Sequence, residues 1–225
     1  TRYISVTGVQ TCALPIYIVT RASSMDLTPV TNASIYAGYG TYESKEYRAN
    51  ANHSNNGFKI NFSALDRSTD GYRVNSGSNQ QAGILNMQNQ FDAFRVGISF
   101  DMDNLNARTP GSLTLAQFKS DPRQAQGPTY LNDYGVNHAN RVAGFIETDI
   151  DGYNIRASLS RKDREVAFYS SRYSRSNNLN TTNNYADIVV KKQTDLGFGK
   201  NKIVGGVELN TWSRSEEHTS ELQSH

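Results

Sequence analysis

The stretch that decides the fold reads Phe-Arg-Val-Gly-Ile-Ser-Phe-Asp-Met, residues 94–102. Its apolar side chains occupy every second position from Phe94 to Met102, and small or polar side chains fill the positions between them. Successive side chains of a β-strand point to opposite faces, so this alternation predicts a strand with one apolar face and one polar face.

The same alternation recurs along the chain. Each apolar stripe, with its flanks, is about as long as the roughly 9–11 residues that a tilted strand needs to cross a bilayer. Charged side chains nearly all lie between the stripes' apolar positions. The exception is Lys192, which we expect near a turn, where its amine can reach polar surroundings. A soluble sheet with one face on a core gives the same alternation. The further stripes are Phe58/Ile60/Phe62/Ala64, Tyr153/Ile155/Ala157/Leu159, and, more weakly, Val142/Gly144/Ile146, Ala186/Ile188/Val190 and Ile203/Gly205/Val207/Leu209.

The connections between these segments favour the membrane alternative. About nine β-segments are predicted between Asn32 and Trp212, joined alternately by short and long connections. Short turns at one end and long loops at the other are typical of an outer-membrane β-barrel, whereas a sandwich spreads its loops over both ends. We therefore predict an all-β antiparallel meander, part of a transmembrane barrel, forming an open curved sheet with unpaired edges near Ala33 and Trp212. The short connections are residues 55–57, 92–93, 151–152 and 198–201, and the long ones are residues 68–80, 104–138 and 164–183.

Composition sets further bounds. The mean hydropathy of −0.63 and the lack of an 18-residue apolar run argue against transmembrane helices. A net charge of +2 gives no support for a nucleic-acid partner. Inside the longest loop, residues 113–119 are predicted to form a short helix capped by Ser112.

Both ends of the chain resemble translated sequencing adapter. Residues 1–16 match the in-frame reading of such an adapter, and residues 214–225 match its reverse complement. We therefore assign both segments as adapter-derived and expect them to pack poorly. The one cysteine, Cys12, lies in the first of them, so the rest of the chain offers no redox or zinc motif.

Four motifs resemble the start of the barrel of a TonB-dependent outer-membrane receptor of the ferric-citrate or siderophore type. Tyr-Ile-Val-Thr-Arg at 17–21 resembles the end of that family's plug domain. Gly-Tyr-Gly-Thr-Tyr at 38–42 and Arg-Ser-Thr-Asp-Gly-Tyr-Arg at 67–73 resemble barrel-strand sequences. Residues 110–124 resemble a loop of these receptors.

The resemblance implies a fragment of a larger protein. Such a receptor has a 22-stranded barrel around a plugged lumen. Residues 17–31 would supply the end of the plug and a linker, and residues 32–213 would supply the N-terminal part of the barrel. The implied function is gated import of a ferric siderophore or similar chelate across the outer membrane, without enzymatic activity or cofactor. The implied partners are the chelate, the TonB complex through the plug, and outer-membrane lipid and lipopolysaccharide.

Bulky anionic chelates suit arginine and aromatic groups on outer loops. The alternative for each arginine is solvation or contact with lipopolysaccharide phosphates. The candidates are Arg73 in the second loop, Arg123, Gln124 and Tyr130 in the third, and Arg172, Tyr173 and Arg175 in the fourth.

Other chemistry has little support in the sequence. His53 and His138 are far apart and are expected to be exposed turn and loop residues, which leaves no basis for a catalytic triad. Asp101 and Asp103 lack the glycine and glutamate of a calcium loop, so no metal site is predicted. Two other functions stay open: a passive porin-like channel without a plug, and a secreted soluble β-rich binding module.

Overall fold

The computed structural model describes residues 29–171, 175–195 and 199–220. Within them the chain forms nine strands, one short α-helix and one 3-10 turn. In chain order these are β1 Val30–Gly40, β2 Ser44–Asn55, β3 Phe58–Thr69, β4 Ser78–Gln90, β5 Phe94–Arg108, α1 Leu115–Ser120, η2 Pro128–Tyr130, β6 Tyr134–Ile150, β7 Tyr153–Ser170, β8 Arg175–Asp195 and β9 Lys200–Ser220.

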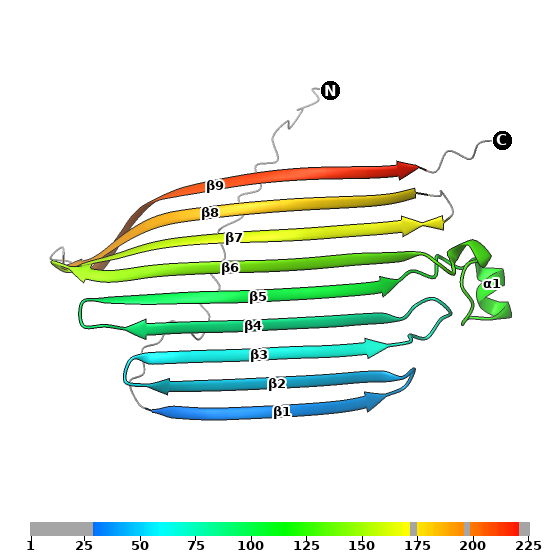
Figure 1. Cartoon of the computed structure of the whole chain (residues 1–225), viewed down its shortest axis with the longest axis horizontal. Coiled ribbons are helices and arrows are strands. Elements are labelled where there is room, and N and C mark those ends of the chain that lie inside the picture. The colour runs from blue at the N-terminus through cyan, green and yellow to red at the C-terminus, as the bar shows by residue number, and fades with distance from the viewer. Residues whose placement is uncertain (1–28, 172–174, 196–198, 221–225) are drawn as a thin grey trace, which may run out of the picture.

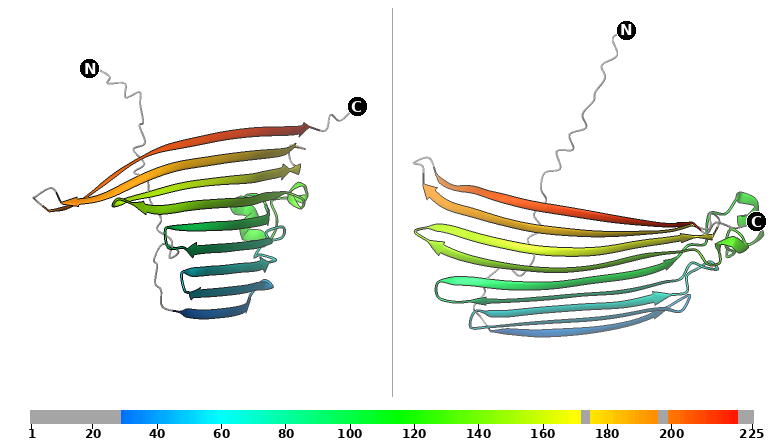
Figure 2. Two further views of the ribbon diagram at one scale, coloured as in Figure 1. Left: turned by 60° about the vertical axis from the view of Figure 1, so that its left-hand side comes forward. Right: turned by 45° about the horizontal axis from the view of Figure 1, so that its top comes forward.

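All nine strands belong to one antiparallel sheet in which spatial order equals chain order. The sheet is open, with β1 and β9 as its two edges, and it is curved and twisted (Figures 1 and 2). The predicted fold class, the number of strands and the position of both edges are therefore confirmed.

Two of the tight turns are fixed by their sequence. Asn56-Gly57 joins β2 to β3 and Asp151-Gly152 joins β6 to β7, and all four residues have positive φ, between 46° and 83°. Two such residues in a row match a type I′ turn, whose twist fits antiparallel strands and which favours Asn-Gly and Asp-Gly. These dipeptides set the register of their hairpins.

One predicted loop is largely strand. Residues 164–183 were expected to form a long loop, but β7 runs on to Ser170 and β8 starts at Arg175. The two strands stay paired up to Ser170 and Arg175, so the polar residues in 164–170 and 175–183 satisfy their backbone groups in the ladder. The connections at the loop-bearing end therefore differ in length. The first of them, residues 41–43 between β1 and β2, is short, so short and long connections do not alternate strictly. His53 and His138 also lie within strands, β2 and β6, rather than in a turn and a loop.

The predicted helix is present but starts two residues later. Its N-cap is Thr114, whose side chain accepts from the backbone N–H of Gln117 (3.2 Å), while the Gln117 side chain accepts from the Thr114 N–H (2.9 Å). This reciprocal pair is a capping box, which needs Glu or Gln three residues after the cap. Ser112 is followed at that spacing by Leu115 and cannot form one.

The register places all the predicted apolar stripes on one face. Phe62 on β3 lies beside Leu85, which lies beside Phe100, then Val142, and the same alignment continues through β9. Among the described residues no second layer covers this apolar face: Phe58, Phe100 and Leu159 keep 40%, 43% and 67% of their surface exposed. Ala125 is the one buried apolar residue within the described ranges. The sheet is a single layer without a core of its own.

The apolar stripe shifts steadily from strand to strand. On β1 the apolar face carries Ala33, Ile35 and Ala37. The row of paired residues through Ile35 passes Met102 and ends at Ser213, beyond the β9 stripe of residues 203–209. The shift is about one residue per strand, or ~3.3 Å along the strands for each ~4.8 Å step across them. This corresponds to a strand tilt of about 35° relative to the axis of a barrel, the lower end of the range for membrane barrels.

The opposite face, called here the polar face, carries a charged cluster around Phe145. Glu147 accepts from Arg95 (2.5 Å) and from Arg156 (3.3 Å), and Arg95 and Glu147 are only 12% and 15% exposed. The guanidinium of Arg156 lies 3.9 Å from the centre of the Phe145 ring. The ring itself covers Gly97 on the neighbouring strand, where an added Cβ would overlap it.

The Gly97→Val variant tests this packing. The valine forces Phe145 out of its place between the two arginines, and we expect a loss of about 1–3 kcal/mol in the free energy of unfolding. Urea titration of the refolded 225-residue chain in detergent micelles, followed by far-ultraviolet circular dichroism, measures it. Gly144→Val is the matched control, because an added Cβ there meets nothing closer than the Gly97 carbonyl oxygen at 3.5 Å. Equal losses in both variants would contradict the argument.

The strand β9 continues past Ser213 to Ser220, paired with β8 up to Arg175. The side chains of residues 214–217 are exposed. Backbone pairing at a sheet edge does not depend on side-chain identity, so a foreign sequence can extend an edge strand. The adapter origin of residues 214–225 stays a prediction, and residues 1–28 lie outside the described ranges.

Candidate functional site

The irregular segments gather at one end of the sheet, beside α1 (Figure 1). They comprise residues 41–43, 70–77 and 109–133, together with Ser171 at the end of β7, and are called here the loop assembly. The other end carries the tight turns.

Arg73 ties two of the loops together. Its Nε donates to the Gln124 carbonyl (3.0 Å), and its two terminal nitrogens donate to the carbonyls of Gly111 (2.7 Å) and Pro110 (3.3 Å). A backbone bond from Val74 to the Arg123 carbonyl (2.7 Å) runs beside it. The Arg73 guanidinium thus donates three hydrogen bonds to backbone carbonyls of residues 109–133, a loop outside the strand ladder.

Asn75 provides a second link between the same loops. Its amide nitrogen donates to the carbonyls of Tyr130 (2.6 Å), Asp133 (3.0 Å) and Thr109 (3.3 Å). The residue has a φ of 58°, a left-handed conformation that asparagine tolerates better than most residues. Arg73 and Asn75 together satisfy carbonyls at both ends of residues 109–133, which holds this loop against residues 70–77.

Asp133 fastens the assembly to the neighbouring hairpin. Its side chain is almost fully buried, with 2% of the residue exposed. One carboxylate oxygen accepts from the Ser171 backbone N–H (2.8 Å) and from the Ser171 hydroxyl. Backbone and hydroxyl donors therefore compensate the burial of this carboxylate. The contact joins the β5–β6 loop to the end of β7.

Arg123, unlike Arg73, places its guanidinium beside aromatic rings. Its guanidinium carbon lies 5.8 Å from the ring centres of both Tyr42 and Tyr72, whose rings meet edge to face at 5.6 Å. Its Nε donates to the Tyr72 carbonyl (3.3 Å). Arg123, Tyr42 and Tyr72 are all exposed. This group, called here the arginine–tyrosine cluster, combines a cation with aromatic surface, which suits an anionic ligand.

The structure brings four of the predicted ligand-binding residues together. Arg73, Arg123, Gln124 and Tyr130 all lie in the loop assembly, but the Gln124 side chain donates to carbonyls of its own loop, those of Gln117 and Asp121. Arg172 and Tyr173 lie outside the described residues, and Arg175 begins β8, with its side chain outside them. The ligand role of all seven stays a prediction.

The sequence-based selection did not include Tyr42, Tyr72, Asn75 or Asp133. Tyr72 stands inside the Asp-Gly-Tyr-Arg motif, so the motif could have pointed to it. Tyr42 lies in the preceding turn and meets Tyr72 only through the β2–β3 pairing. Asn75 and Asp133 act on backbone groups distant in the chain, and no pattern in the sequence indicates such contacts.

Other kinds of site find no support in the described ranges. His53 contacts the Thr31 hydroxyl (2.7 Å), and His138 lies 3.8 Å from the Glu165 carboxylate. Asp101 pairs with Arg141 (2.8 Å) and Asp103 accepts from Gln80 (2.6 Å). No group of three or more potential His, Cys, Asp or Glu metal ligands occurs in this part of the chain.

No helix in the described ranges combines the length and the apolar character that crossing a bilayer requires.

Fold and loops together define an open segment of a β-barrel with one loop-bearing end. No protein-family model and no curated protein matches the chain. The unliganded ferric citrate transporter FecA superposes with a TM-score of 0.68 over 86% of this chain at 12% identity. The ferripyoverdine receptor of the outer membrane of Pseudomonas aeruginosa, bound to ferripyoverdine, gives 0.69, 89% and 9%. The siderophore receptor PiuA from Acinetobacter baumannii gives 0.61, 84% and 14%.

The chain spans only 30%, 30% and 31% of the length of these three structures. At such identities the likeness establishes the fold, which is the one that the resemblance to TonB-dependent receptors predicted. The solved structures are those of transport proteins and receptors, not of enzymes.

The Arg73→Met variant tests the role of Arg73 as a link between loops. It leaves three carbonyls without their donor, and each lost bond to a charged donor is worth about 1.5–3 kcal/mol. We expect faster amide hydrogen exchange in residues 109–133 and unchanged exchange in β5 and β6. Arg67→Met, an exposed arginine on β3, is the matched control. Unchanged exchange in the Arg73 variant would exclude a bracing role.

Proposed function

We propose that the chain is a fragment of a TonB-dependent outer-membrane transporter that imports a ferric siderophore or a similar iron chelate. Residues 17–31 form the end of its plug and a linker, and residues 32–213 form the first strands of its barrel. The protein works as a gated transporter rather than as an enzyme. Ligand binding at the loops is relayed to the plug, on which the TonB complex acts.

The observation that carries this proposal is the uncovered apolar face. Large apolar side chains on eight of the strands, among them Ile35, Phe62, Phe100, Leu159 and Val207, are exposed on one side of a single-layer sheet. Exposed apolar patches beyond a few hundred Å² mark contact with a partner or a membrane. Hydrocarbon suits this face because the stripes keep a bilayer-spanning length and a barrel-like tilt across the sheet.

The loop assembly supports the ligand-binding part of the proposal. A loop held by Arg73 and Asn75 is ordered before a ligand arrives, which lowers the entropic cost of binding. The arginine–tyrosine cluster is the described surface best suited to an anionic chelate. The charged cluster around Phe145 lies on the polar face, which in a barrel faces the lumen and, in this family, the plug.

A matched pair of arginine substitutions tests the orientation of the sheet. Ile98 and Ser99 are neighbours on β5 that face opposite sides. An arginine on the lipid side near the bilayer midplane costs about 2–4 kcal/mol, whereas one on the lumen side is solvated. We expect Ile98→Arg to lower the folded fraction of the chain in phosphatidylcholine vesicles strongly, and Ser99→Arg to leave it nearly unchanged. Urea titration with circular dichroism measures both.

The same preparation separates the proposal from its rivals. A chain that folds in buffer without detergent or lipid would favour a soluble binding module. Equal sensitivity of Ile98 and Ser99 to arginine would remove the lipid-facing assignment. A plug-encoding sequence upstream of Tyr17 in the genome distinguishes a gated receptor from a porin-like channel.

The ligand role is tested in the complete receptor that contains this chain. Arg123→Ala and Arg172→Ala are expected to weaken binding of the ferric chelate, each by about tenfold if a charge-assisted hydrogen bond is lost. Equilibrium binding of the iron-loaded chelate to cells that express each variant measures the effect. Lys162→Ala, on a strand outside the loop assembly, serves as the control. Unchanged affinity in both arginine variants would remove them from the binding site.

A further inference from the structure

The two edges of the sheet run in the same direction. Because each strand is antiparallel to its neighbour and the sheet has nine strands, β1 and β9 both point toward the loop-bearing end (Figure 1). Neither edge has a strand partner on its outer side within the described ranges. The sheet cannot close on itself into a barrel that is antiparallel throughout, because a contact between β1 and β9 would be parallel.

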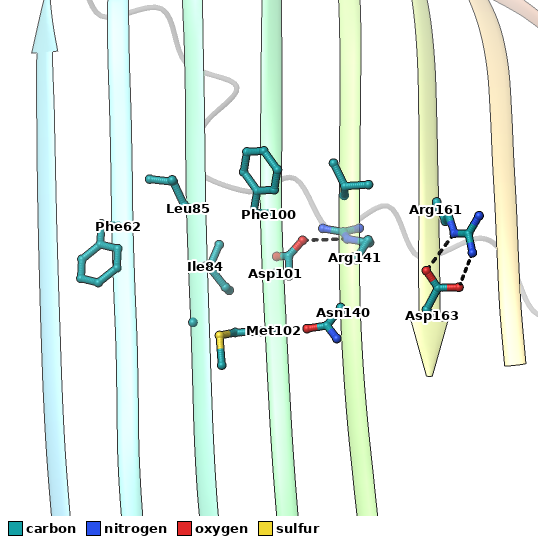
Figure 3. Close-up of a pocket in the computed structure, with 12 residues that line it drawn as sticks. Phe62, Ile84, Leu85, Phe100, Asp101, Met102, Asn140, Arg141, Arg161 and Asp163 are labelled. Atoms are coloured by element: carbon teal, nitrogen blue, oxygen red, sulfur yellow. Dashed lines mark hydrogen bonds and ion pairs between the residues drawn. The ribbon is translucent and has the colours of Figure 1, made fainter. Parts of the chain in front are cut away.

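Hydrocarbon requires a partner for both edges. If the apolar face is turned to lipid or detergent, as the proposed function requires, the N–H and C=O groups along each edge have no water to bind. Figure 3 shows the continuity of this face: Phe62, Leu85 and Phe100 lie side by side on three neighbouring strands. In the complete receptor both edges would pair with its remaining strands. The 225-residue chain by itself needs another partner.

The β1 edge lacks the features that usually protect an edge strand. Natural edges are commonly blocked by lysine, proline, a bulge or an inward-pointing charge. Residues 30–40 contain no charged residue and no proline, and their pairing with β2 runs without a bulge. Ile35, at the centre of β1, keeps 88% of its surface exposed. An added strand therefore meets no obstacle along β1.

A second copy of β1 fits this edge. In an antiparallel pair centred on Ile35, Val30 of one copy faces Gly40 of the other, so all 11 residues are paired. Ala33 then faces Ala37 of the other copy. Residues that face each other across an antiparallel pair lie on the same side of the sheet, so the apolar faces of the two copies form one surface.

The strand β9 allows the same kind of pairing, centred on Gly206. The two ends of its apolar stripe, residues 203–209, then face each other, and the stripe stays on the face that β9 shares with β8. Lys202 and Glu208 are the charged residues between positions 202 and 210, and each faces an uncharged residue of the other copy. No like charges therefore oppose each other across this part of the contact.

We propose that two copies of this chain close one barrel, with β1 paired to β1 and β9 paired to β9. Twice nine strands gives 18, a number that porin barrels also use. One twofold axis, perpendicular to the barrel axis, passes through both contacts, so every pair of neighbouring strands is antiparallel. The two loop assemblies lie at opposite ends of this barrel, an arrangement that a detergent micelle accommodates.

Native mass spectrometry of the refolded chain in detergent micelles counts the copies. We expect a species of about 50 kDa, twice the 25.0 kDa of one chain. Ser34→Lys with Tyr36→Lys puts two like-charge pairs across the β1 contact and should raise the dissociation constant of the dimer about tenfold. The matched control is Ser158→Lys with Ser160→Lys, at the same spacing on the polar face of the inner strand β7.

A charge swap separates lost pairing from lost folding. A third variant carries Ser34→Glu with Tyr36→Glu, and its own copies should also repel each other. Mixed with the lysine variant, it should form the mixed dimer with an affinity close to that of the unmodified chain, because each lysine then faces a glutamate. A mixture that stays monomeric would contradict the β1 contact.

Disulfide formation tests the register of each contact in a Cys12→Ser background. Ile35→Cys should cross-link two chains on mild oxidation, since its Cα atoms would lie roughly 4.5–5.5 Å apart, which a disulfide can span. Ala37→Cys is the control on the same face, because its two copies lie more than about 13 Å apart in the proposed register. Val204→Cys with Glu208→Cys tests β9, where each cysteine faces the other one across the contact.

One chain per micelle with native strand content by circular dichroism, or equal cross-linking at residues 35 and 37, would overturn the proposal. Assemblies of more than two chains, which an open array of paired edges would give, would overturn it as well. Failure of the proposed function gives a different result. In that case Ile98→Arg and Ser99→Arg lower the folded fraction equally, whatever the number of copies.

Discussion

The structure depends on backbone hydrogen bonds between neighbouring strands. A single-layer sheet has no interior in which side chains can be buried, and among the described residues only Ala125 is a buried apolar residue. Every strand except the two at the edges is paired on both sides over nearly its whole length. In a bilayer such pairing is obligatory, because hydrocarbon offers no partner for an N–H or C=O group. The edges of β1 and β9 are where this requirement is left open.

This constraint explains why the two faces and the two ends of the sheet differ. The hydrogen-bond ladder involves only the backbone. Successive side chains point to opposite faces, so one face can be apolar and the other polar without any effect on the pairing. At the turn end, Asn56-Gly57 and Asp151-Gly152 close the ladder at once. At the loop end, residues 109–133 have no strand partner, and side chains form the hydrogen bonds to their backbone carbonyls. Arg73 and Asn75 donate to the carbonyls that lack a strand partner there.

Arginine therefore has three distinct roles in one sheet. Arg73 is enclosed by carbonyls and holds loops together. Arg95 and Arg156 share Glu147 and flank Phe145 on the polar face. Arg123 lies at the surface beside tyrosine rings, and Arg161 pairs with Asp163 on its own strand. Residue type alone does not separate these roles, because each follows from which carbonyl, carboxylate or ring the register brings within reach.

The sequence by itself determined the strands, their apolar parity, the tight turns and the meander order. These are local properties: alternation has a period of two, and Asn-Gly or Asp-Gly tolerates the positive φ of a hairpin turn. The capping box of α1 is local as well, since Thr114 and Gln117 stand at the required spacing, although the sequence-based prediction placed the cap at Ser112. Only the tertiary structure decided that residues 164–170 and 175–183 stay paired as strand, that Tyr42 meets Tyr72, and that the Phe145 ring covers Gly97. Each of these depends on residues far apart in the chain, which meet only when the register of several strands is set at once.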